Sequence, residues 1–319
     1  MSSDNRIITI TMNPAIDMEA EVETVVPERK MRCGTPRRDP GGGGINVSRV
    51  IKRLGGSSTA YYLAGGHYGR RLEELVKEEG IESRRILTGS ETRENLVFKE
   101  RSSEKQYRFL MSGGKVAEEE WKSLLDKLSL MENVPDHVVA SGSLPPGVPS
   151  GFFRELSNTC VRIGSKLIVD TSGASLKELA ELEVFLLKPN RNEFKELAGE
   201  GVEELDRQKE EALKIIKKGK VKNIVVSLGH RGALAVSEDE CEYVPAPQVM
   251  VKSIVGAGDS MLAGIVVSLD RGNALAEAVR FGVACGTAAV LTPGTELCRK
   301  EDADRIYKKI TKKDEQALT

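Results

Sequence analysis

The 319-residue sequence has few aromatic residues and almost no net charge. Aromatic residues make up 4% of the chain, and 47 Lys and Arg residues balance 48 Asp and Glu residues. Nucleic-acid-binding proteins usually carry a basic excess, so we expect no nucleic-acid partner. A balanced net charge is still compatible with a local cluster of basic residues. The longest apolar stretch, Met261 to Leu269, contains Gly264 and Ser268 and stops at Asp270, which is far short of a membrane span.

Cysteine and histidine are also scarce, and neither forms a metal-binding pattern. The five cysteines include no Cys-x-x-Cys pair and the three histidines are scattered, so we expect reduced thiols and no zinc site. The polar start, Met1 to Arg6, and an apolar stretch interrupted at Thr9 do not make a signal peptide. We therefore expect a cytoplasmic protein with no membrane association.

What the sequence does contain is an alternation of short apolar runs with helical periodicity, from about residue 130 to residue 290. Apolar runs at 137–140, 166–169, 184–187 and 223–228 predict buried strands, separated by amphipathic helices. Uniformly apolar strands between helices indicate a parallel sheet that is covered on both faces. The fold class is therefore predicted to be α/β.

Two β-rich segments, about 17–38 and 93–111, interrupt this pattern in the first part of the chain. Residues 93–111 place Leu96 and Phe98 two residues apart, and Tyr107 and Phe109 two residues apart, as half-buried strands do. We expect the two segments to pair as a small sheet outside the main layer. The sequence contains no repeat or obvious linker, so a single domain over residues 1–319 is predicted, with both segments inserted in it.

The most informative motif runs from Val255 to Ser260 and reads Val-Gly-Ala-Gly-Asp-Ser. An apolar stripe follows and predicts a helix that begins where the glycines end. The free N–H groups of a first helical turn attract an anion, and the glycines let a ligand approach closely. Asp259 would repel phosphate there, but it suits the removal of a proton from a hydroxyl that attacks phosphorus. The alternative interpretation is an Asp N-cap after a flexible turn.

A run of four glycines, Gly41 to Gly44, is followed by Ile45-Asn46 and a predicted helix. Such a run indicates a hinge or a backbone that lies against a ligand, and the alternative is a plain loop. The chain has no Gly-x4-Gly-Lys-Ser/Thr sequence, and the third glycine of a dinucleotide fingerprint is missing. The absence of that fingerprint argues against a dinucleotide-dependent oxidoreductase.

Two further motifs follow predicted strands, where ligands gather in parallel sheets. Asp17, in Asn-Pro-Ala-Ile-Asp, would accept hydrogen bonds from substrate hydroxyls, or it is a turn residue after proline. Asn190 and Glu193, in Lys-Pro-Asn-Arg-Asn-Glu, would hold Mg²⁺-bound water near a nucleotide, or they form a helix capping box.

Basic residues concentrate between Arg29 and Arg38, a segment that contains five of them and no acidic residue. Arg93 and Arg108 lie in the other β-rich segment. Pairing the two segments would gather these positive charges at one site for a small anion. Arg suits such a site because its guanidinium can hold a phosphate through two hydrogen bonds. We expect the acids that balance this charge to lie elsewhere in the chain. The alternative for each residue is a solvated basic face.

Taken together and in order, these motifs resemble the ribokinase-like sugar kinases of the PfkB family from end to end. The matching segments also include Ser141-Gly142-Ser143-Leu144-Pro145-Pro146-Gly147 and Val225-Val226-Ser227-Leu228-Gly229. Related members often have Lys at position 43. The all-glycine run, with Lys30-Met31-Arg32-Cys33 upstream and Gln106-Tyr107-Arg108-Phe109 downstream, looks most like the minor-type 6-phosphofructokinases of the phosphosugar branch. The resemblance implies a three-layer α/β/α fold, a mostly parallel central sheet and a small β-sheet lid.

The resemblance implies a kinase that transfers the γ-phosphoryl of MgATP to the C1 hydroxyl of fructose 6-phosphate. The alternatives are tagatose-6-phosphate kinase, 1-phosphofructokinase, and a non-catalytic sugar-phosphate sensor, which would have lost Asp259 or Gly258. Asp259 would be the base, beside an anion hole at Gly256, Ala257 and Gly258. Residues toward the sugar hydroxyls would be Asp17, Gly42, Gly43 and Asn46. Residues around the 6-phosphate would be Lys30, Arg32, Arg93, Arg108 and Ser143.

The same resemblance implies a nucleotide site, a cation site and a dimer. The nucleotide site would be lined by Lys188, Asn190, Ser227, Gly229 and Thr287, with Glu193 ordering the water shell of Mg²⁺. A possible K⁺ would lie near Ser253, Val255, Ala289 and Gly294. Thr292 and Glu296 depart from the Asn and Arg expected in the most similar relatives, and an acid at 296 would either alter cation preference or face solvent. The lid would also form a homodimer interface.

Overall fold

The protein, described here from a computed structural model over residues 6–173 and 175–317, is built around a nine-stranded sheet. Its strands, in spatial order, are β13 (Cys241–Val244), β12 (Ala233–Val236), β11 (Val221–Ser227), β10 (Val184–Leu187), β9 (Lys166–Asp170), β8 (His137–Ser141), β1 (Ile7–Thr11), β4 (Thr59–Ala64) and β5 (Glu82–Leu87). Both pairings of β12 are antiparallel and the others are parallel. The predicted mostly parallel sheet is therefore confirmed.

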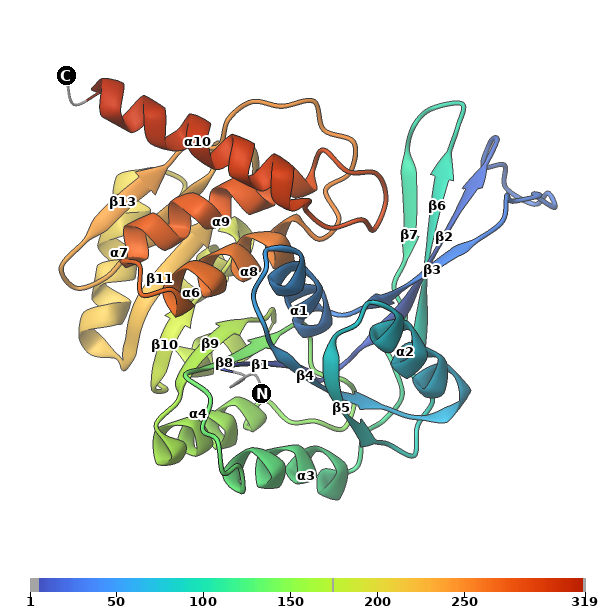
Figure 1. Cartoon of the computed structure of the whole chain (residues 1–319), viewed down its shortest axis with the longest axis horizontal. Coiled ribbons are helices and arrows are strands. Elements are labelled where there is room, and N and C mark those ends of the chain that lie inside the picture. Colours follow the sequence, from blue (N-terminus) through green and yellow to red (C-terminus); the bar gives the residue numbers. More distant parts are fainter. Residues whose placement is uncertain (1–5, 174, 318–319) are drawn as a thin grey trace.

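Helices cover both faces of this sheet, and the alternation of side chains along each strand explains how (Figure 1). Val138 and Ala140 of β8 pack on one side, while Val139 between them packs on the other. The first side carries α3 (Glu118–Ser129), α4 (Phe152–Ile163), α5 (Ser175–Leu179), α6 (Arg191–Ala198) and α7 (Leu205–Lys218). The second carries α1 (Gly43–Arg53), α2 (Gly66–Glu78), α8 (Ala257–Asp270), α9 (Leu275–Ala289) and α10 (Lys300–Ala317). The three-layer α/β/α prediction is confirmed.

A second, four-stranded sheet projects from the body (Figure 1). Its strands are β3 (Arg37–Gly41), β2 (Ala15–Val22), β6 (Arg93–Glu100) and β7 (Gln106–Phe109), in that order. The central pair, β2 and β6, is parallel and joins the two β-rich segments, as the sequence predicts. Because β2 starts four residues after β1 ends, the root of the small sheet lies beside the carboxyl end of β1.

Within residues 6–173 and 175–317, no helix combines the length and apolar character that crossing a bilayer requires.

Candidate active site

The carboxyl ends of the central parallel strands bring the predicted polar motifs to one edge of the large sheet. Lys188 follows β10, and its N–H donates to the carbonyl oxygen of Val169 in β9 at 3.0 Å. Asn190 forms a bridge with Ser227 at the end of β11. Gly142, after β8, donates its N–H to the carbonyl oxygen of Asp170 at 2.9 Å. These segments are distant in sequence, so the sheet itself assembles the site.

The N-terminus of α8 faces this edge and begins at Gly256, whose φ of 70° lies in the left-handed region. A Cβ at this position would overlap the side chain of Leu297, so both the dihedral and the space require glycine. Gly256 is the N-cap, and Asp259 is the third residue of the helix. The N-cap interpretation of Asp259 is therefore wrong, because its carboxylate lies inside the first turn. The N–H groups of that turn have no intrahelical acceptors and are available to an anion.

Asp259 lies in an environment that makes it a weaker acid than an ordinary aspartate. Burial and the nearby Asp170 carboxylate raise its pKa to about 6, although a hydrogen bond from Asn46 and the charge of Lys188 favour the ionised form. The Asn46 Nδ2 donates to Asp259 Oδ2 at 2.9 Å. A carboxylate with a pKa close to neutral is well matched to accepting a proton at physiological pH.

A buried ion pair lies beside this carboxylate and joins two strand ends. The Lys188 ammonium is 2.9 Å from Asp170 Oδ2, and the two side chains are 4% and 16% exposed. Lys188 was predicted from its motif, whereas Asp170 was missed. The signal was present, because Asp170 directly follows the apolar run 167–169, just as Asp17 follows an earlier strand. The same strand-end rule would have found both.

The glycine run is not a plain loop. It spans the end of β3 and the first turn of α1, which starts at Gly43. A Cβ at Gly43 would overlap Ser141 of β8, and a Cβ at Gly44 would overlap the carbonyl oxygen of Ile10 in β1. The glycines thus let α1 pack end-on against two strand ends, which aims Asn46 at Asp259.

Asp17 lies at the root of the small sheet, opposite Asp39 of β3 and Asn95 of β6. Burial raises the pKa of this carboxyl group, while a hydrogen bond from Asn95 and the charge of Arg93 oppose the rise. The Asn95 Nδ2 donates to Asp17 Oδ1 at 2.8 Å. Asn95 was missed in the sequence, because only the pairing of β2 with β6 reveals that it faces Asp17.

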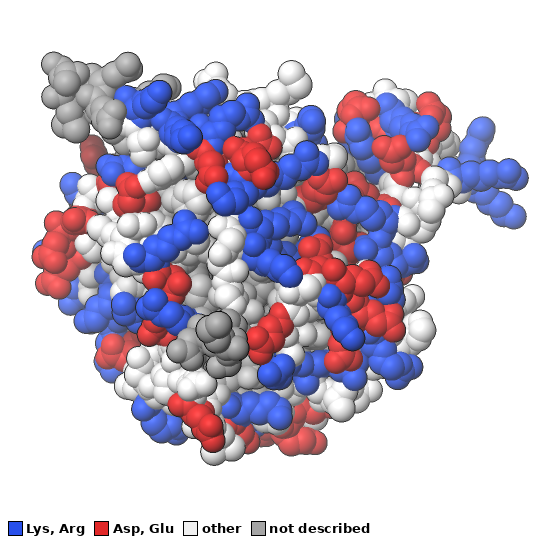
Figure 2. All heavy atoms as spheres, in the orientation of Figure 1, with Lys and Arg blue, Asp and Glu red and all other residues white. Residues whose placement is uncertain are grey.

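Within a single copy of the protein, the residues predicted to bind the 6-phosphate lie apart from one another. Lys30 and Arg32 are exposed on the loop between β2 and β3, at the tip of the small sheet, where Figure 2 shows a protruding group of basic side chains. Arg108 is exposed on β7, and Ser143 contacts Asn13 through a 3.4 Å hydrogen bond.

Arg93 is half-buried at the root of the sheet. Its guanidinium donates to the main-chain oxygens of Asn13 at 2.8 Å and Met111 at 2.7 Å. It thereby ties β6 to the loop after β1, and burial lowers its pKa although the charge of Asp17 opposes this.

The expectation that the acids balancing the basic segment lie elsewhere is wrong. Arg37 pairs with Asp39 at 2.7 Å and with Glu296 at 3.2 Å. Arg38 pairs with Glu94 at 2.9 Å. Asp39 lies two residues further along β3, Glu94 lies on β6, and Glu296 lies between α9 and α10, so carboxylates from three parts of the chain hold Arg37 and Arg38.

Among the residues predicted to bind a nucleotide, Asn190 and Glu193 form the capping box that was the alternative interpretation of their motif. Asn190 Oδ1 accepts the N–H groups of Asn192 and Glu193, and Glu193 Oε2 accepts the N–H of Asn190 at 2.7 Å. Burial raises the pKa of Glu193 against the effect of its cap hydrogen bond. Gly229 is exposed just after β11, and Thr287 is buried on α9.

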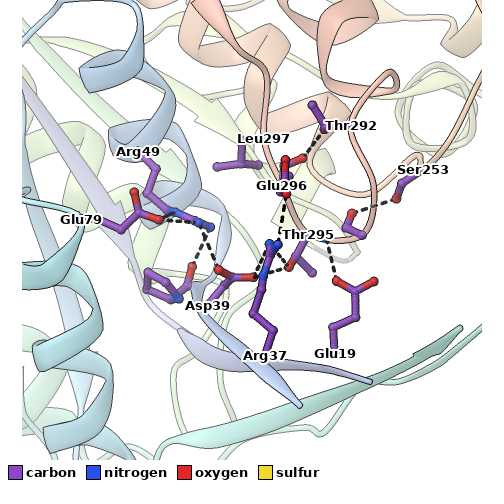
Figure 3. A network of polar contacts seen from close by, with 12 residues as sticks. Glu19, Arg37, Asp39, Arg49, Glu79, Ser253, Thr292, Thr295, Glu296 and Leu297 are labelled. Atoms are coloured by element: carbon purple, nitrogen blue, oxygen red, sulfur yellow. Dashed lines mark hydrogen bonds and ion pairs between the residues drawn. The ribbon is translucent and has the colours of Figure 1, made fainter. Parts of the chain in front are cut away.

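The two segments that carry the predicted cation residues, 253–255 and 289–294, lie next to each other, and Figure 3 shows Ser253 from the first and Thr292 from the second. Ser253 Oγ donates to the carbonyl oxygen of Gly294 at 2.9 Å and accepts the N–H of Val255 at 3.2 Å. Thr292 Oγ1 contacts the carbonyl oxygen of Ala289 at 2.7 Å.

The carboxylate of Glu296 points away from these carbonyls toward Arg37 and Arg299, at 3.2 and 2.9 Å. It therefore neither joins the cation residues nor simply faces solvent. Within the described part of the chain, no group of three or more His, Cys, Asp or Glu residues is arranged to hold a metal ion by itself.

Comparison with known proteins is consistent with this geometry. Residues 3–302 match the family described as pfkB family carbohydrate kinase. A Mycobacterium tuberculosis protein named ATP-dependent 6-phosphofructokinase isozyme 2 is 42% identical over 302 residues, which cover 95% of this chain and 89% of that protein. The Escherichia coli protein of the same name is 40% identical over 303 residues, covering 95% and 98%.

Solved structures give the same result. Phosphofructokinase-2 from Escherichia coli in complex with substrates and products matches with a TM-score of 0.90 and 39% identity, over 96% of this chain and 99% of that chain. The same enzyme in complex with potassium matches with a TM-score of 0.92 over the same shares. The chain therefore belongs to the pfkB family of carbohydrate kinases.

Proposed function

We propose that the protein is an ATP-dependent 6-phosphofructokinase, which transfers the γ-phosphoryl group of ATP to the C1 hydroxyl of fructose 6-phosphate. The products are fructose 1,6-bisphosphate and ADP. The observation that carries the proposal is the position of Asp259, a carboxylate of raised pKa inside the first turn of α8. The names of relatives that are 40–42% identical over nearly the whole chain support the same substrate pair.

Asp259 acts as the general base in this proposal. With a pKa of about 6, its carboxylate is mostly ionised at neutral pH and accepts the proton of the attacking hydroxyl. General-base catalysis of this kind is worth about 10²–10⁴-fold in rate. The N–H groups of Gly256, Ala257 and Gly258 hold the charge of the transferring phosphoryl group, as an anion hole does.

The sugar is held between the root of the small sheet and the start of α1. Asp17, Gly42, Gly43 and Asn46 border this space, and the half-buried carboxylate of Asp17 accepts sugar hydroxyls. Arg93 of β6, Arg108 of β7 and Ser143 after β8 would approach the sugar phosphate from three separate segments. Lys30 and Arg32 reach the 6-phosphate only if the small sheet closes or a second copy of the chain presents its tip.

The nucleotide binds on the other side of Asp259, along the ends of β10 and β11. Lys188, Asn190, Ser227, Gly229 and Thr287 form this side. Glu193 could order a water molecule of the Mg²⁺ shell. Its Oε2 accepts the N–H of Asn190 in the helix cap, and its other carboxylate oxygen is left to accept a hydrogen bond from such a water. When bound, Mg²⁺ neutralises charge on the nucleotide phosphates.

A monovalent cation fits the segments at 253–255 and 289–294, where the grouped oxygens are carbonyls and hydroxyls. The potassium complex of the Escherichia coli relative supports K⁺ as this ion. The backbone carbonyls of Ser253, Val255, Ala289 and Gly294 would supply its ligands.

We also propose that two copies assemble through the small sheet. The side chains of Met31, on the loop between β2 and β3, and of Phe109, Leu110 and Met111, at and just after the end of β7, are 44–70% exposed, which makes an apolar contact surface on this small sheet and its loops. A relative from Escherichia coli is described as tetrameric in its inhibited form, so light scattering, which separates a dimer from a monomer and from a tetramer, is the appropriate measurement.

The function is tested by measuring kcat/KM for three phosphosugars in parallel, with ADP release as the readout. Fructose 6-phosphate is expected to exceed tagatose 6-phosphate and fructose 1-phosphate. The 1-phosphofructokinase of Bacillus subtilis is 30% identical over 293 residues, which makes fructose 1-phosphate the strongest competitor. No ADP release with fructose 6-phosphate at any Mg²⁺ concentration would overturn the proposal.

A further inference from the structure

Arg49 of α1 is a buried cation that the proposed chemistry leaves without a role. Its side chain is 2% exposed. The guanidinium donates to Glu79 Oε1 at 2.7 Å through Nη2 and at 3.1 Å through Nε, and Nη1 donates to the carbonyl oxygen of Pro40 at 3.1 Å (Figure 3). Asp39 lies 3.6 Å away. The end of α2 and strand β3 therefore fix the guanidinium in one place.

The same guanidinium reaches the active site through Asn46. Arg49 Nη1 is 3.4 Å from Asn46 Oδ1, and the three-residue spacing puts both side chains on one face of α1. Arg has only hydrogen-bond donors, so it can face only the oxygen end of the amide. The NH₂ end of Asn46 is then directed to Asp259 Oδ2, at 2.9 Å.

We infer that Arg49, anchored by Glu79, is a positioning residue for the general base: it orients the Asn46 amide so that its NH₂ group, and not its oxygen, meets Asp259. This inference rests on the proposed function of Asp259. If the amide turned over, its oxygen would meet the carboxylate, and two acceptors would face each other without a proton between them. The Glu79–Arg49–Asn46 relay prevents that arrangement.

The charged groups around Asp259 show why one amide matters. Asp170 from β9 and Asp17 from β2 disfavour its ionised form, and Lys188 after β10 favours it. The hydrogen bond from Asn46 is the second influence that favours the ionised carboxylate of Asp259. If the amide turned over, the Lys188 ammonium would be the main group left to stabilise that charge.

The test is the pH dependence of kcat in Arg49→Lys, which keeps the positive charge but not the planar fork of donors. We expect the acid limb of the kcat profile to move to a pH about one unit higher, because the ionised form of Asp259 becomes about tenfold less favoured relative to the protonated form. The kcat would then fall about eightfold at pH 5.5 and hardly at pH 8.5. The matched control is Arg53→Lys, one turn further along α1. Arg53 also lies near Glu79, at 3.7 Å, but its own hydrogen bond goes to the carbonyl oxygen of Leu297.

A uniform loss of kcat at every pH, or a profile identical to that of the wild type, would overturn the inference. If Arg49→Lys does not fold, Glu79→Ala removes the anchor and is expected to shift the acid limb in the same direction by a smaller amount. In an Asn46→Ala background, Arg49→Lys is expected to cause no further shift, because the relay acts through the amide.

A second readout does not depend on turnover. In protein labelled with ¹³C at the aspartate carboxyl carbons, the Asp259 resonance is assigned by its loss in Asp259→Asn and then titrated. Its midpoint is expected near pH 6 in the wild type and higher in Arg49→Lys. A wild type that makes no fructose 1,6-bisphosphate would refute the proposed function. An unmoved midpoint would refute the relay, whatever the activity.

Discussion

Replacing Asp259 by asparagine is expected to abolish turnover and, at the same time, to stabilise the fold. The carboxyl group has a pKa of about 6 in the folded protein, against an ordinary value of 3.8. The folded state therefore holds the proton more tightly than the unfolded chain does, and ionising this group costs stability as the pH rises from about 4 to above 6. Asparagine keeps the shape and an acceptor for Asn46 but carries no charge to bury.

The magnitude follows from the two pKa values. The difference of 2.2 between 3.8 and about 6 corresponds to an upper limit of about 3 kcal/mol at pH 7.5. At pH 5 the folded group is mostly protonated, so the advantage of asparagine falls to about half that value. Loss of the base is expected to lower kcat by at least ~10²-fold while nucleotide binding remains.

The assay is urea denaturation of wild type and Asp259→Asn at pH 7.5 and pH 5, beside a kinetic measurement. Asp239→Asn, an exposed substitution between β12 and β13, is the matched control and is expected to change neither property. A variant that is no more stable than the wild type at pH 7.5, or that keeps more than about a tenth of kcat, would refute the reasoning.

Three further substitutions test other parts of the site. Asp170→Asn leaves the Lys188 ammonium buried without its 2.9 Å partner, so the free energy of unfolding should fall by about 3 kcal/mol in urea titrations. A fall below about 1 kcal/mol would show that the pair is solvated. Gly256→Ala forces a side chain into a left-handed turn against Leu297, and kcat should fall about 10²-fold in a protein that still folds by circular dichroism. Asp17→Ala should raise KM for fructose 6-phosphate at least ~10-fold and leave KM for ATP unchanged, since the contact is with sugar hydroxyls. Equal effects on both KM values would contradict that assignment.

The fold was predictable wherever strands are short, apolar and central. Strands β8 to β10 are buried on both faces, so their apolar runs stand out in the sequence. Edge strands carry no such signal. β5 reads Glu-Ser-Arg-Arg-Ile-Leu and β3 reads Arg-Arg-Asp-Pro-Gly, because charge and proline are tolerated at a sheet edge.

The site was predictable to the extent that parallel strand ends mark it. That rule found Asp17, Asn190 and Glu193, the glycine-rich turn located Asp259, and the family resemblance supplied Lys188. Asn95 and Arg49 were out of reach, because each is defined by a partner far along the chain. Arg49 meets Glu79 thirty residues later, and no local pattern shows that its charge is buried.

Chemical identification of the product tests the central proposal most directly. With ATP, Mg²⁺ and fructose 6-phosphate carrying ¹³C at C1, the proposed reaction predicts a new phosphate ester at C1. The C1 resonance should acquire coupling to ³¹P, the 6-phosphate should stay intact, and one ADP should appear for each ester formed. ADP formation without C1 esterification, or an unchanged sugar after prolonged incubation, would contradict it.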